Sequence, residues 1–307
     1  MKLNHKHILG LREMSADEIH LILETAKQFQ EVLSRPIRKV PALRGKSVCT
    51  LFFEPSTRTR SSFEMAAKIL SAETSSVTVA SSSVKKGETL KDTVLTMDAM
   101  GVDCFIIRHS SSGAPELASR YARGHVLNAG DGCHEHPSQG LLDLLTITQH
   151  KSTFEDLKVV IVGDIWHSRV ARSTFWGLHH VGADVTLCAP HTLLPQEFVG
   201  FGARLETDFN TAIQDADVVI MLRLQNERMD GTFLPSPREY AQLYGLNARR
   251  LKLAKPDAIV MHPGPINRGV EIAGDVADGE QSVILQQVHN GVAVRMALLH
   301  LLLGGEA

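Results

Sequence analysis

Short apolar runs alternate with longer helical patterns along most of this 307-residue sequence. The run Lys158-Val-Val-Ile-Val-Gly163 is typical of a buried strand. Because parallel strands must be joined by crossovers, the alternation predicts an α/β fold with mainly parallel sheets flanked by helices. The predicted strands cover residues 47–53, 74–80, 104–109, 125–129, 158–163, 184–189, 203–207, 217–222 and 257–261.

The chain is long enough for two domains of ordinary size. A capping-box pattern, Ser15-Ala-Asp-Glu18, begins a helix that is predicted to run to residue 34. The apolar spacing near 138–150 predicts a helix that links the two halves of the chain. Residues 285–303 predict a long helix at the C-terminal end. We therefore expect one domain over residues 1–137, a linking helix at 138–150, a second domain over 151–285 and a C-terminal helix at 286–307.

Composition narrows the class of protein. The net charge of −2 argues against a general polyanion binder such as a nucleic-acid protein. No run of about 18 apolar residues predicts a membrane span, and the start of the chain lacks the apolar stretch of a signal peptide. The scattered cysteines make no metal-like spacing and suit reduced thiols in a cytoplasm: Cys49, Cys104, Cys133 and Cys188.

The densest polar motif is Ser56-Thr-Arg-Thr-Arg60, between a predicted strand and a predicted helix. Free backbone N–H groups, hydroxyls, guanidinium groups and the positive end of the helix dipole converge at such a junction. A helix cap needs only one hydroxyl or carboxylate, so this motif exceeds that need. It predicts an anion site, and phosphate is the expected anion.

Other polar clusters also follow predicted strands, where ligands of open α/β sheets bind. We expect one cleft between the domains to collect them. His136, with Gln139 one turn later, could polarise a carbonyl and bind an amide, whereas Arg169 suits a carboxylate. Arg223 and Gln225 would share a side if their strand continues. The clusters are Arg108-His109, Asp131–Gln139, Asp164–Arg169, Arg223–Arg228 and His262–Arg268.

Each cluster also has a simpler interpretation. Arg108 could be a surface charge, Asp164 a helix cap, and the turn at His262-Pro-Gly-Pro265 only a tight turn. The basic loop at 81–90 could be a solvated linker or could close over a dianion. Histidines at i and i+2 before a proline favour no zinc site, and the segment after Asp164 lacks the glycines of an NAD turn.

Taken in order, these clusters resemble the aspartate/ornithine carbamoyltransferase family over roughly residues 5–303. The signature is the segment Phe53-Glu-Pro-Ser-Thr-Arg-Thr-Arg60-Ser-Ser-Phe-Glu64. An ornithine enzyme would be expected to carry a His-Cys-Leu-Pro turn and a Ser-Met-Gly segment. Here, His262-Pro-Gly-Pro265 and Arg223-Leu-Gln-Asn-Glu-Arg228 are similar to the aspartate branch instead. Gly264 departs from the leucine of some relatives.

The resemblance implies roles for particular residues. The phosphate would be held by Ser56, Thr57, Arg58 and Thr59, and the carbamoyl group by Arg108, His136 and Gln139. Aspartate would be held by Arg169, Arg223 and Gln225. Lys86 and a loop serine, Ser82 or Ser83 with Ser82 favoured, would bind in trans from a neighbouring subunit. Pro263 and Gly264 would offer carbonyls to the carbamoyl NH₂ and to the attacking amine.

The resemblance also implies an enzyme that forms N-carbamoyl-L-aspartate and phosphate, in pyrimidine biosynthesis. Arg58, Thr59, Lys86, Arg108 and His136 would be the catalytic residues. No metal or cofactor is expected. The family would form a homotrimer with shared active sites, with a regulatory chain or a dihydroorotase as further candidate partners, and its last helix would pack on the first domain. The alternatives are an ornithine or other amino-acid carbamoyltransferase and a non-catalytic anion-binding module.

Overall fold

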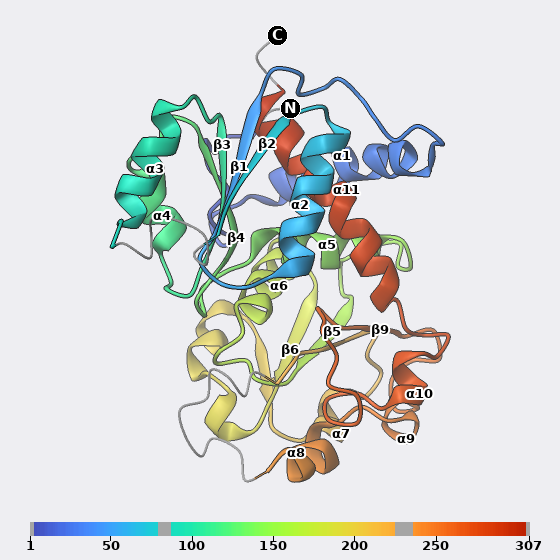
Figure 1. Ribbon diagram of the computed structural model, residues 1–307. Coiled ribbons are helices and arrows are strands. Elements are labelled where there is room, and N and C mark those ends of the chain that lie inside the picture. The colour runs from blue at the N-terminus through green and yellow to red at the C-terminus, as the bar shows by residue number, and fades with distance from the viewer. Residues whose placement is uncertain (1–2, 79–86, 225–235, 305–307) are drawn as a thin grey trace. The chain divides into compact units, whose positions relative to one another are not determined.

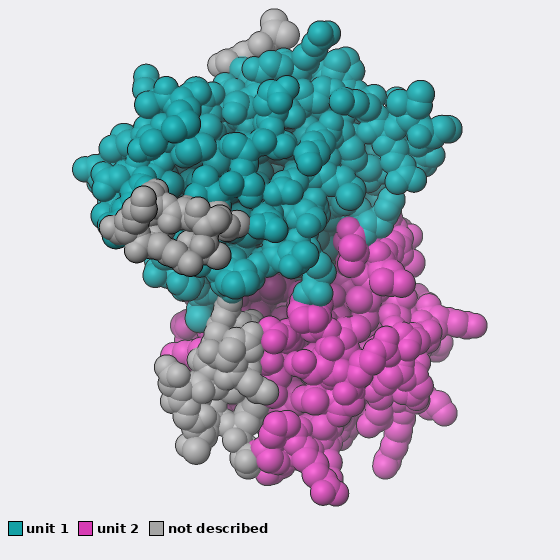
Figure 2. Space-filling view, in the orientation of Figure 1, with its two compact units in different colours: residues 1–145, 289–307 teal, residues 146–288 magenta. Residues whose placement is uncertain are grey.

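The computed structural model describes residues 3–78, 87–224 and 236–304. The chain divides into two compact units, coloured separately in Figure 2. Unit 1 contains residues 1–145 and 289–307, and unit 2 contains residues 146–288. The division falls within helix α5 (Pro137–Thr148). Each unit has a parallel sheet flanked by helices, which confirms the expected fold class (Figure 1).

Unit 1 is built on a four-stranded parallel sheet in the order β2-β1-β3-β4. The order changes direction between β1 and β3, so the carboxyl ends of these two strands form the switch point at which such sheets bind ligands. Its strands are β1 (Ser47–Phe52), β2 (Glu73–Thr78), β3 (Cys104–His109) and β4 (His125–Asp131).

Helices cover both faces of this sheet, which explains why its strands read as nearly continuous apolar runs. Cys49, Leu51, Phe105 and Ile107 pack on the face that α3 and α4 cover. Figure 1 shows α2 and α11 on the other side. The helices of unit 1 besides α5 are α1 (Ala16–Ser34), α2 (Thr57–Ile69), α3 (Leu90–Ala99), α4 (Ala114–Ser119) and α11 (Ile284–Leu303).

Two predictions about helices are confirmed: the capping box at the start of α1, and the packing of the C-terminal helix on the N-terminal domain. At the start of α1, Ser15 accepts from the Glu18 N–H, and the Glu18 carboxylate accepts from the Ser15 N–H, which completes the capping box. Most of α11 belongs to unit 1. There, Gln30 donates to Asn290 and the ring of Phe29 meets His300 edge-on at 5.5 Å. The C-terminal helix therefore packs on the N-terminal domain.

Unit 2 contains a five-stranded parallel sheet in the order β7-β6-β5-β8-β9. The order reverses between β5 and β8, so a second switch point lies beyond the carboxyl ends of these strands. A buried cluster that includes Val160, Val219, Val260 and Tyr240 fills one face. The strands are β5 (Lys158–Val162), β6 (Asp184–Cys188), β7 (Arg204–Glu206), β8 (Val218–Met221) and β9 (Ile259–Met261).

The helices of unit 2 are mostly short. Ser168 caps α6, and Asp208, Ser236 and Asn247 cap α7, α8 and α9 through side chains that accept backbone N–H bonds. They are α6 (Arg169–His180), η3 (His191–Leu193), η4 (Gln196–Phe201), α7 (Phe209–Ala212), α8 (Pro237–Tyr244), α9 (Ala248–Leu251) and α10 (Gly274–Ala277).

Two further expectations concern the whole chain. All four cysteines are free thiols, and burial raises the pKa of Cys49, Cys104 and Cys188. Such thiols stay protonated and unreactive. Within the part of the chain that the structure describes, no helix is both long and apolar enough to cross a membrane.

Candidate functional site

The anion motif lies where β1 passes into α2. β1 ends at Phe52, Ser56 is the N-cap, and α2 begins at Thr57. The Ser56 side chain makes no capping bond within the described residues, and the first turn of α2 carries no acidic residue. Thr57 and Arg58 are exposed, whereas Thr59 is buried. The helix start therefore offers its N–H groups and hydroxyls to an external anion.

Arg108 lies at the neighbouring strand end. Its Nη2 donates to Oε1 of Glu54 at 3.2 Å, and its Nη1 donates to the Ala129 carbonyl at 3.4 Å. The side chain is largely buried, and the Arg108 carbonyl accepts from the Phe53 N–H. Because β1 and β3 pair directly, Arg108 and the start of α2 lie at one edge of the sheet. Both occupy the switch point of unit 1.

His136 and Gln139 lie at the start of α5, and both are buried. The Gln139 N–H donates to the His136 carbonyl at 2.9 Å, which makes the first turn. Nε2 of Gln139 donates to Oδ1 of Asp143 at 3.0 Å, one turn further along the helix. This turn follows the end of β4, the strand whose Ala129 carbonyl Arg108 contacts. Three predicted carbamoyl-phosphate segments of unit 1, the start of α2, Arg108 and the start of α5, thus lie at or after the carboxyl ends of neighbouring strands.

A buried polar network holds the loop that carries His136. Asp131 Oδ1 accepts from Nδ2 of Asn128 at 2.7 Å and from the Glu135 N–H at 3.1 Å. The Glu135 carboxylate accepts in turn from the backbone N–H groups of Leu11 and Arg12. Sequence reasoning missed these supports. Nothing in the local sequence Asp131-Gly-Cys-His-Glu-His136 indicated that Glu135 would bind the distant backbone of Leu11 and Arg12.

Unit 2 places two predicted residues at its own switch point. Arg169 is the first residue of α6, and its side chain is buried. Asp164, also buried, follows β5 and accepts from the His167 N–H at 3.0 Å, while Ser168 caps α6. Arg169 therefore begins the helix after β5, where a carboxylate ligand would meet both the guanidinium and the helix N-terminus.

Arg223 follows β8, and the continuation of the strand on which its shared side with Gln225 depended is not present over residues 222–224. β8 ends at Met221, because its pairing with β5 stops there. The alternation argument that placed Arg223 and Gln225 on one side therefore does not apply. Gln225 lies outside the described residues, as do Lys86, Ser82 and Ser83 of the predicted basic loop.

The turn after β9 is held by a buried pair. Nδ1 of His262 accepts from the Gly264 N–H at 2.8 Å, and its Nε2 lies 3.1 Å from Oε1 of Glu271. Glu271 Oε1 also accepts from the Asn267 N–H. Gly264 has a φ of +65°, which suits glycine, and its peptide bond to Pro265 is cis. His262 and Glu271 were not predicted as supports of Pro263 and Gly264, although both sit close to them in the sequence.

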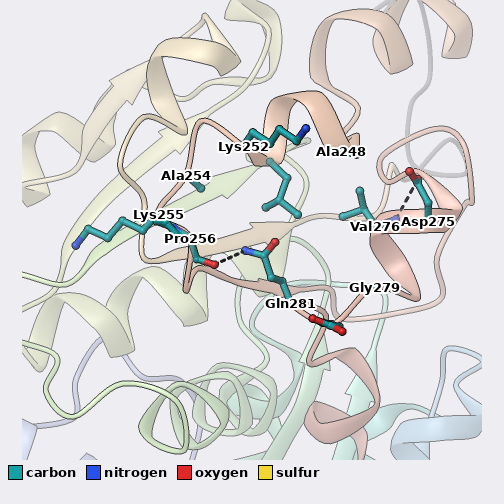
Figure 3. Close-up of a pocket in the computed structure, with 11 residues that line it drawn as sticks. Ala248, Lys252, Ala254, Lys255, Pro256, Asp275, Val276, Gly279 and Gln281 are labelled. Atoms are coloured by element: carbon teal, nitrogen blue, oxygen red, sulfur yellow. Dashed lines mark hydrogen bonds between the residues drawn. The ribbon is translucent and has the colours of Figure 1, made fainter.

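A separate pocket of about 540 Å³ lies in unit 2 (Figure 3). Lys255, Pro256 and Gln281 line it, and Gln281 Nε2 donates to the Pro256 carbonyl. Lys255 and Pro256 precede β9, whereas Pro263 follows it, so these two lining residues lie at the opposite end of the strand from Pro263. None of the predicted substrate residues lines it. Size alone does not identify the functional site.

Charge and donor chemistry further define the site. Within residues 3–78, 87–224 and 236–304, no group of three or more His, Cys, Asp or Glu side chains could hold a metal ion. His134, one of the histidines considered as a ligand, instead has its Nδ1 3.1 Å from Oδ2 of Asp131. The neighbouring His109 ring is partly buried, which lowers its pKa. The predicted residues of the described part comprise arginines, hydroxyls, a histidine and an amide, together with the carbonyl groups of Pro263 and Gly264.

The two halves of the chain match two family models. Residues 6–149 match the carbamoyl-P binding domain of aspartate/ornithine carbamoyltransferases, and residues 155–302 match their Asp/Orn binding domain. The chain belongs to the aspartate/ornithine carbamoyltransferase family. Within it, the chain is 58% identical over 306 residues to the aspartate carbamoyltransferase catalytic subunit of Syntrophotalea carbinolica, covering 100% of this chain and 98% of the relative. The corresponding subunit of Moorella thermoacetica is 56% identical, with 99% of each chain covered.

Solved structures agree with the fold. An ornithine carbamoyltransferase from Pyrococcus furiosus has a TM-score of 0.88 and 32% identity, with 100% of both chains covered. An aspartate transcarbamoylase from Trypanosoma cruzi, in complex with carbamoyl phosphate and aspartate, also has a TM-score of 0.88 at 30% identity, covering 97% of this chain and 96% of that one. The fold alone therefore does not separate the two activities.

Proposed function

We propose that this chain transfers the carbamoyl group of carbamoyl phosphate to the α-amine of L-aspartate, giving N-carbamoyl-L-aspartate and phosphate. The observation that carries the proposal is the edge of the unit 1 sheet. There, the start of α2, Arg108 and the start of α5 lie at or after the carboxyl ends of the neighbouring strands β1, β3 and β4. The high identity to catalytic subunits of aspartate enzymes favours aspartate over ornithine as the acceptor.

In unit 1, the phosphate is bound by the first turn of α2, whose N–H groups and dipole favour an anion. Arg58 supplies the exposed guanidinium at that turn. Arg108 and His136 contact the carbamoyl oxygen, and Gln139 contacts the carbamoyl NH₂. The residues assigned to carbamoyl phosphate are Ser56, Thr57, Arg58, Thr59, Ser82, Lys86, Arg108, His136, Gln139, Pro263 and Gly264.

In unit 2, two arginines bind the carboxylates of aspartate. Arg169 begins α6 and Arg223 follows β8, so both belong to the switch point of that sheet. Gln225 and Lys86 complete the aspartate set. Carbonyl groups of the turn at Pro263 and Gly264 accept from the attacking amine. The buried pair of His262 and Glu271 supports this assignment, because it holds the turn in one conformation.

The chemistry consists of charge compensation followed by addition and elimination. Arginine side chains offset the repulsion between two anionic substrates, so that their reacting atoms approach. The neutral α-amine of aspartate adds its lone pair to the carbamoyl carbon. Thr59, Arg108 and His136 stabilise the oxyanion that develops, an effect of several kcal/mol in comparable sites. The C–O bond to phosphate then breaks, and the amine proton is lost to the departing phosphate or to water.

The assembly is proposed as a cytoplasmic homotrimer with shared active sites. Lys86 and Ser82 would enter the site from a neighbouring subunit. A regulatory chain or a dihydroorotase remains a candidate partner. The exposed apolar side chains of unit 1, among them Ile37, Met65 and Met100, are compatible with contacts between subunits.

The direct test is an assay with purified protein and two acceptors. Carbamoyl phosphate is supplied with L-aspartate or with L-ornithine, and both phosphate and the carbamoylated amino acid are measured. We expect phosphate release coupled one-to-one to N-carbamoyl-L-aspartate. Citrulline formation would instead establish the ornithine activity. Binding of carbamoyl phosphate without turnover by either acceptor would establish the anion-binding module.

A further inference from the structure

The N-terminal part of the chain lies along the outer edge of the unit 1 sheet. The Ile8 N–H donates to the Val126 carbonyl at 2.9 Å, and the Ile8 carbonyl accepts from the Asn128 N–H at 2.8 Å. These bonds make Ile8 a short parallel extension of the sheet beside β4, its last strand. The backbone groups of an edge strand are covered in this way. The segment thus runs beside the strand that leads into the site.

The same segment continues against the side chain of Glu135, which is only 2% exposed. Oε2 of Glu135 accepts from the Leu11 N–H at 2.7 Å, and Oε1 accepts from the Arg12 N–H at 3.2 Å. A Cβ at Gly10 would collide with Oε1 and would lie 2.8 Å from the carboxyl carbon. A larger residue at position 10 would therefore displace the carboxylate from its two donors.

The backbone of Glu135 is held from the other side by the end of β4. Its N–H donates to Oδ1 of Asp131 at 3.1 Å, and its carbonyl accepts from the Asp131 N–H at 3.1 Å. Nδ2 of Asn128 donates to the same carbonyl at 3.3 Å. The next residue is His136, whose carbonyl accepts from the Gln139 N–H at the start of α5. His136 is therefore fixed between Glu135 and a helix.

This support matters because of what the His136 ring is proposed to do. A group that stabilises a developing oxyanion is effective only at hydrogen-bond distance from the place where that oxygen will be. A shift of about 1 Å can lower a rate on the order of 100-fold. If the Glu135 carboxylate loses its donors, its backbone can move and the His136 ring moves with it. The effect of a change at Gly10 would reach the carbamoyl group by this route.

We propose that Glu135 is a positioning residue: its carboxylate, bound by the N–H groups of Leu11 and Arg12, holds the His136 ring where it stabilises the carbamoyl oxygen. The inference rests on the proposed function, because it explains how a residue of that same site is oriented. Both carboxylate oxygens of Glu135 accept from the N-terminal backbone. Its effect therefore reaches the substrate through His136.

Two variants disturb this support in different ways. Glu135→Gln keeps the size of the side chain but offers one acceptor oxygen instead of two, so an NH₂ group would face one of the backbone donors. Gly10→Ala keeps Glu135 and pushes its carboxylate aside. The matched controls are Glu13→Gln, at an exposed position, and Gly200→Ala, where no atom lies within 4 Å of an added Cβ.

The test is a double-mutant cycle in which each variant is made in wild type and in His136→Ala. Formation of N-carbamoyl-L-aspartate is followed as aspartate is varied, so that kcat and KM are separated. In wild type, we expect Glu135→Gln and Gly10→Ala to lower kcat about tenfold and to change the KM for aspartate less than about twofold. In His136→Ala, the same changes should lower kcat less than about twofold, because the ring that they displace is absent.

The outcomes separate this inference from the proposed function. An equal fold loss of kcat in both backgrounds would show that Glu135 only supports the fold, which overturns its positioning role and leaves the reaction in place. A normal kcat in Gly10→Ala and Glu135→Gln would also overturn it. If wild type forms no N-carbamoyl-L-aspartate, the proposed function itself fails. Near-ultraviolet circular dichroism checks the fold, and if Glu135→Gln does not fold, Gly10→Ala decides alone.

Discussion

Nε2 of His262 lies 3.1 Å from Oε1 of Glu271, and neither side chain has exposed surface. Because Nδ1 of His262 already accepts from the Gly264 N–H, the ring proton must sit on Nε2 and point at Glu271. One carboxylate oxygen therefore holds both the imidazole and the Asn267 N–H. The pair connects the two ends of the turn that carries Pro263 and Gly264.

Removal of the Glu271 carboxylate should loosen this turn. Glu271→Ala leaves the His262 Nε2–H and the Asn267 N–H without their acceptor in a buried place, so we expect the free energy of unfolding to fall by about 2–4 kcal/mol. The KM for aspartate should also rise. Urea unfolding and steady-state kinetics measure the two effects. Glu280→Ala, at an exposed position nearby, is the control. Equal behaviour of the two variants would contradict the role of Glu271.

Arg58→Ala should remove most activity while the protein stays folded. Arg58 is exposed at the start of α2, so its loss should change the free energy of unfolding by less than about 0.5 kcal/mol. Loss of a charge-assisted contact to phosphate should lower kcat/KM by about 100-fold or more. Phosphate release is the measurement, and Arg120→Ala is the control. Near-normal turnover at saturating substrate would remove Arg58 from the phosphate site.

If active sites are shared, two inactive variants should complement each other. Arg58→Ala and Lys86→Ala subunits, mixed after reversible dissociation, should regain roughly a quarter of wild-type activity at equal proportions, since one site in four combines intact residues. Each variant taken alone through the same dissociation is the control. No recovery, after native mass spectrometry has confirmed subunit exchange, would place Lys86 outside its neighbour's site.

Gly163, between β5 and Asp164, should not tolerate a side chain. Its φ is +135°, and an added Cβ would lie 2.9 Å from Cβ of Leu222 and 3.2 Å from the hydroxyl of Tyr240. We expect Gly163→Ala to lower the free energy of unfolding by about 1–3 kcal/mol. Gly200→Ala, where no atom lies within 4 Å, is the matched control and should be nearly neutral. The measurement is thermal and urea unfolding of both variants. An equal free energy of unfolding for Gly163→Ala and Gly200→Ala would contradict the strain expected at Gly163.

His7 should make stability depend on pH. Burial, together with Lys6 and His125, lowers the pKa of His7 to about 4, and its Nδ1 accepts from the Val126 N–H. The unfolded chain, with a pKa near 6.5, binds the proton first as pH falls. The stabilising contribution of neutral His7 to the free energy of unfolding is therefore complete above about pH 6.5 and is lost as the pH falls toward about 4. Since His7 is partly exposed, we expect about 1 kcal/mol after solvent screening.

The measurement is urea unfolding across this pH range for wild type and His7→Asn. The Asn oxygen can still accept from Val126 but does not titrate, so this variant should lose the pH-dependent part. His289→Asn, at an exposed position, is the control. An unchanged pH dependence in His7→Asn would assign the effect to other groups.

Local patterns predicted most of the elements. The runs at 47–53, 104–109 and 158–163 became β1, β3 and β5 because β-branched and apolar residues suit strands buried on both faces. The capping box at Ser15 could be predicted from the sequence because its two partners, Ser15 and Glu18, are three residues apart. Whether the strand at 217–222 continued past Arg223 stayed open, because the pairing with β5 that bounds β8 is made by a distant segment of the chain.

Supporting contacts were not predictable in the same way. Glu135 binds the N–H of Leu11 across 124 residues of sequence, and Arg295 reaches Phe63 from the last helix. The packing of the sheet and helices determines such partners, because a buried charge needs a hydrogen-bond or charge partner that is near in space. No residue spacing in the local sequence predicts these distant partners.

The sequence alone therefore determined the α/β architecture, the anion motif at Ser56–Arg60 and the resemblance to a family, since periodicity and motif chemistry act over a few residues. Only the tertiary structure decided which partners distant in the sequence meet around the site: Glu54 with Arg108, and Glu135 with the backbone of Leu11 and Arg12. The physical reason is that hydrogen bonds and buried charges depend on proximity in space, which chain folding creates between residues distant in sequence.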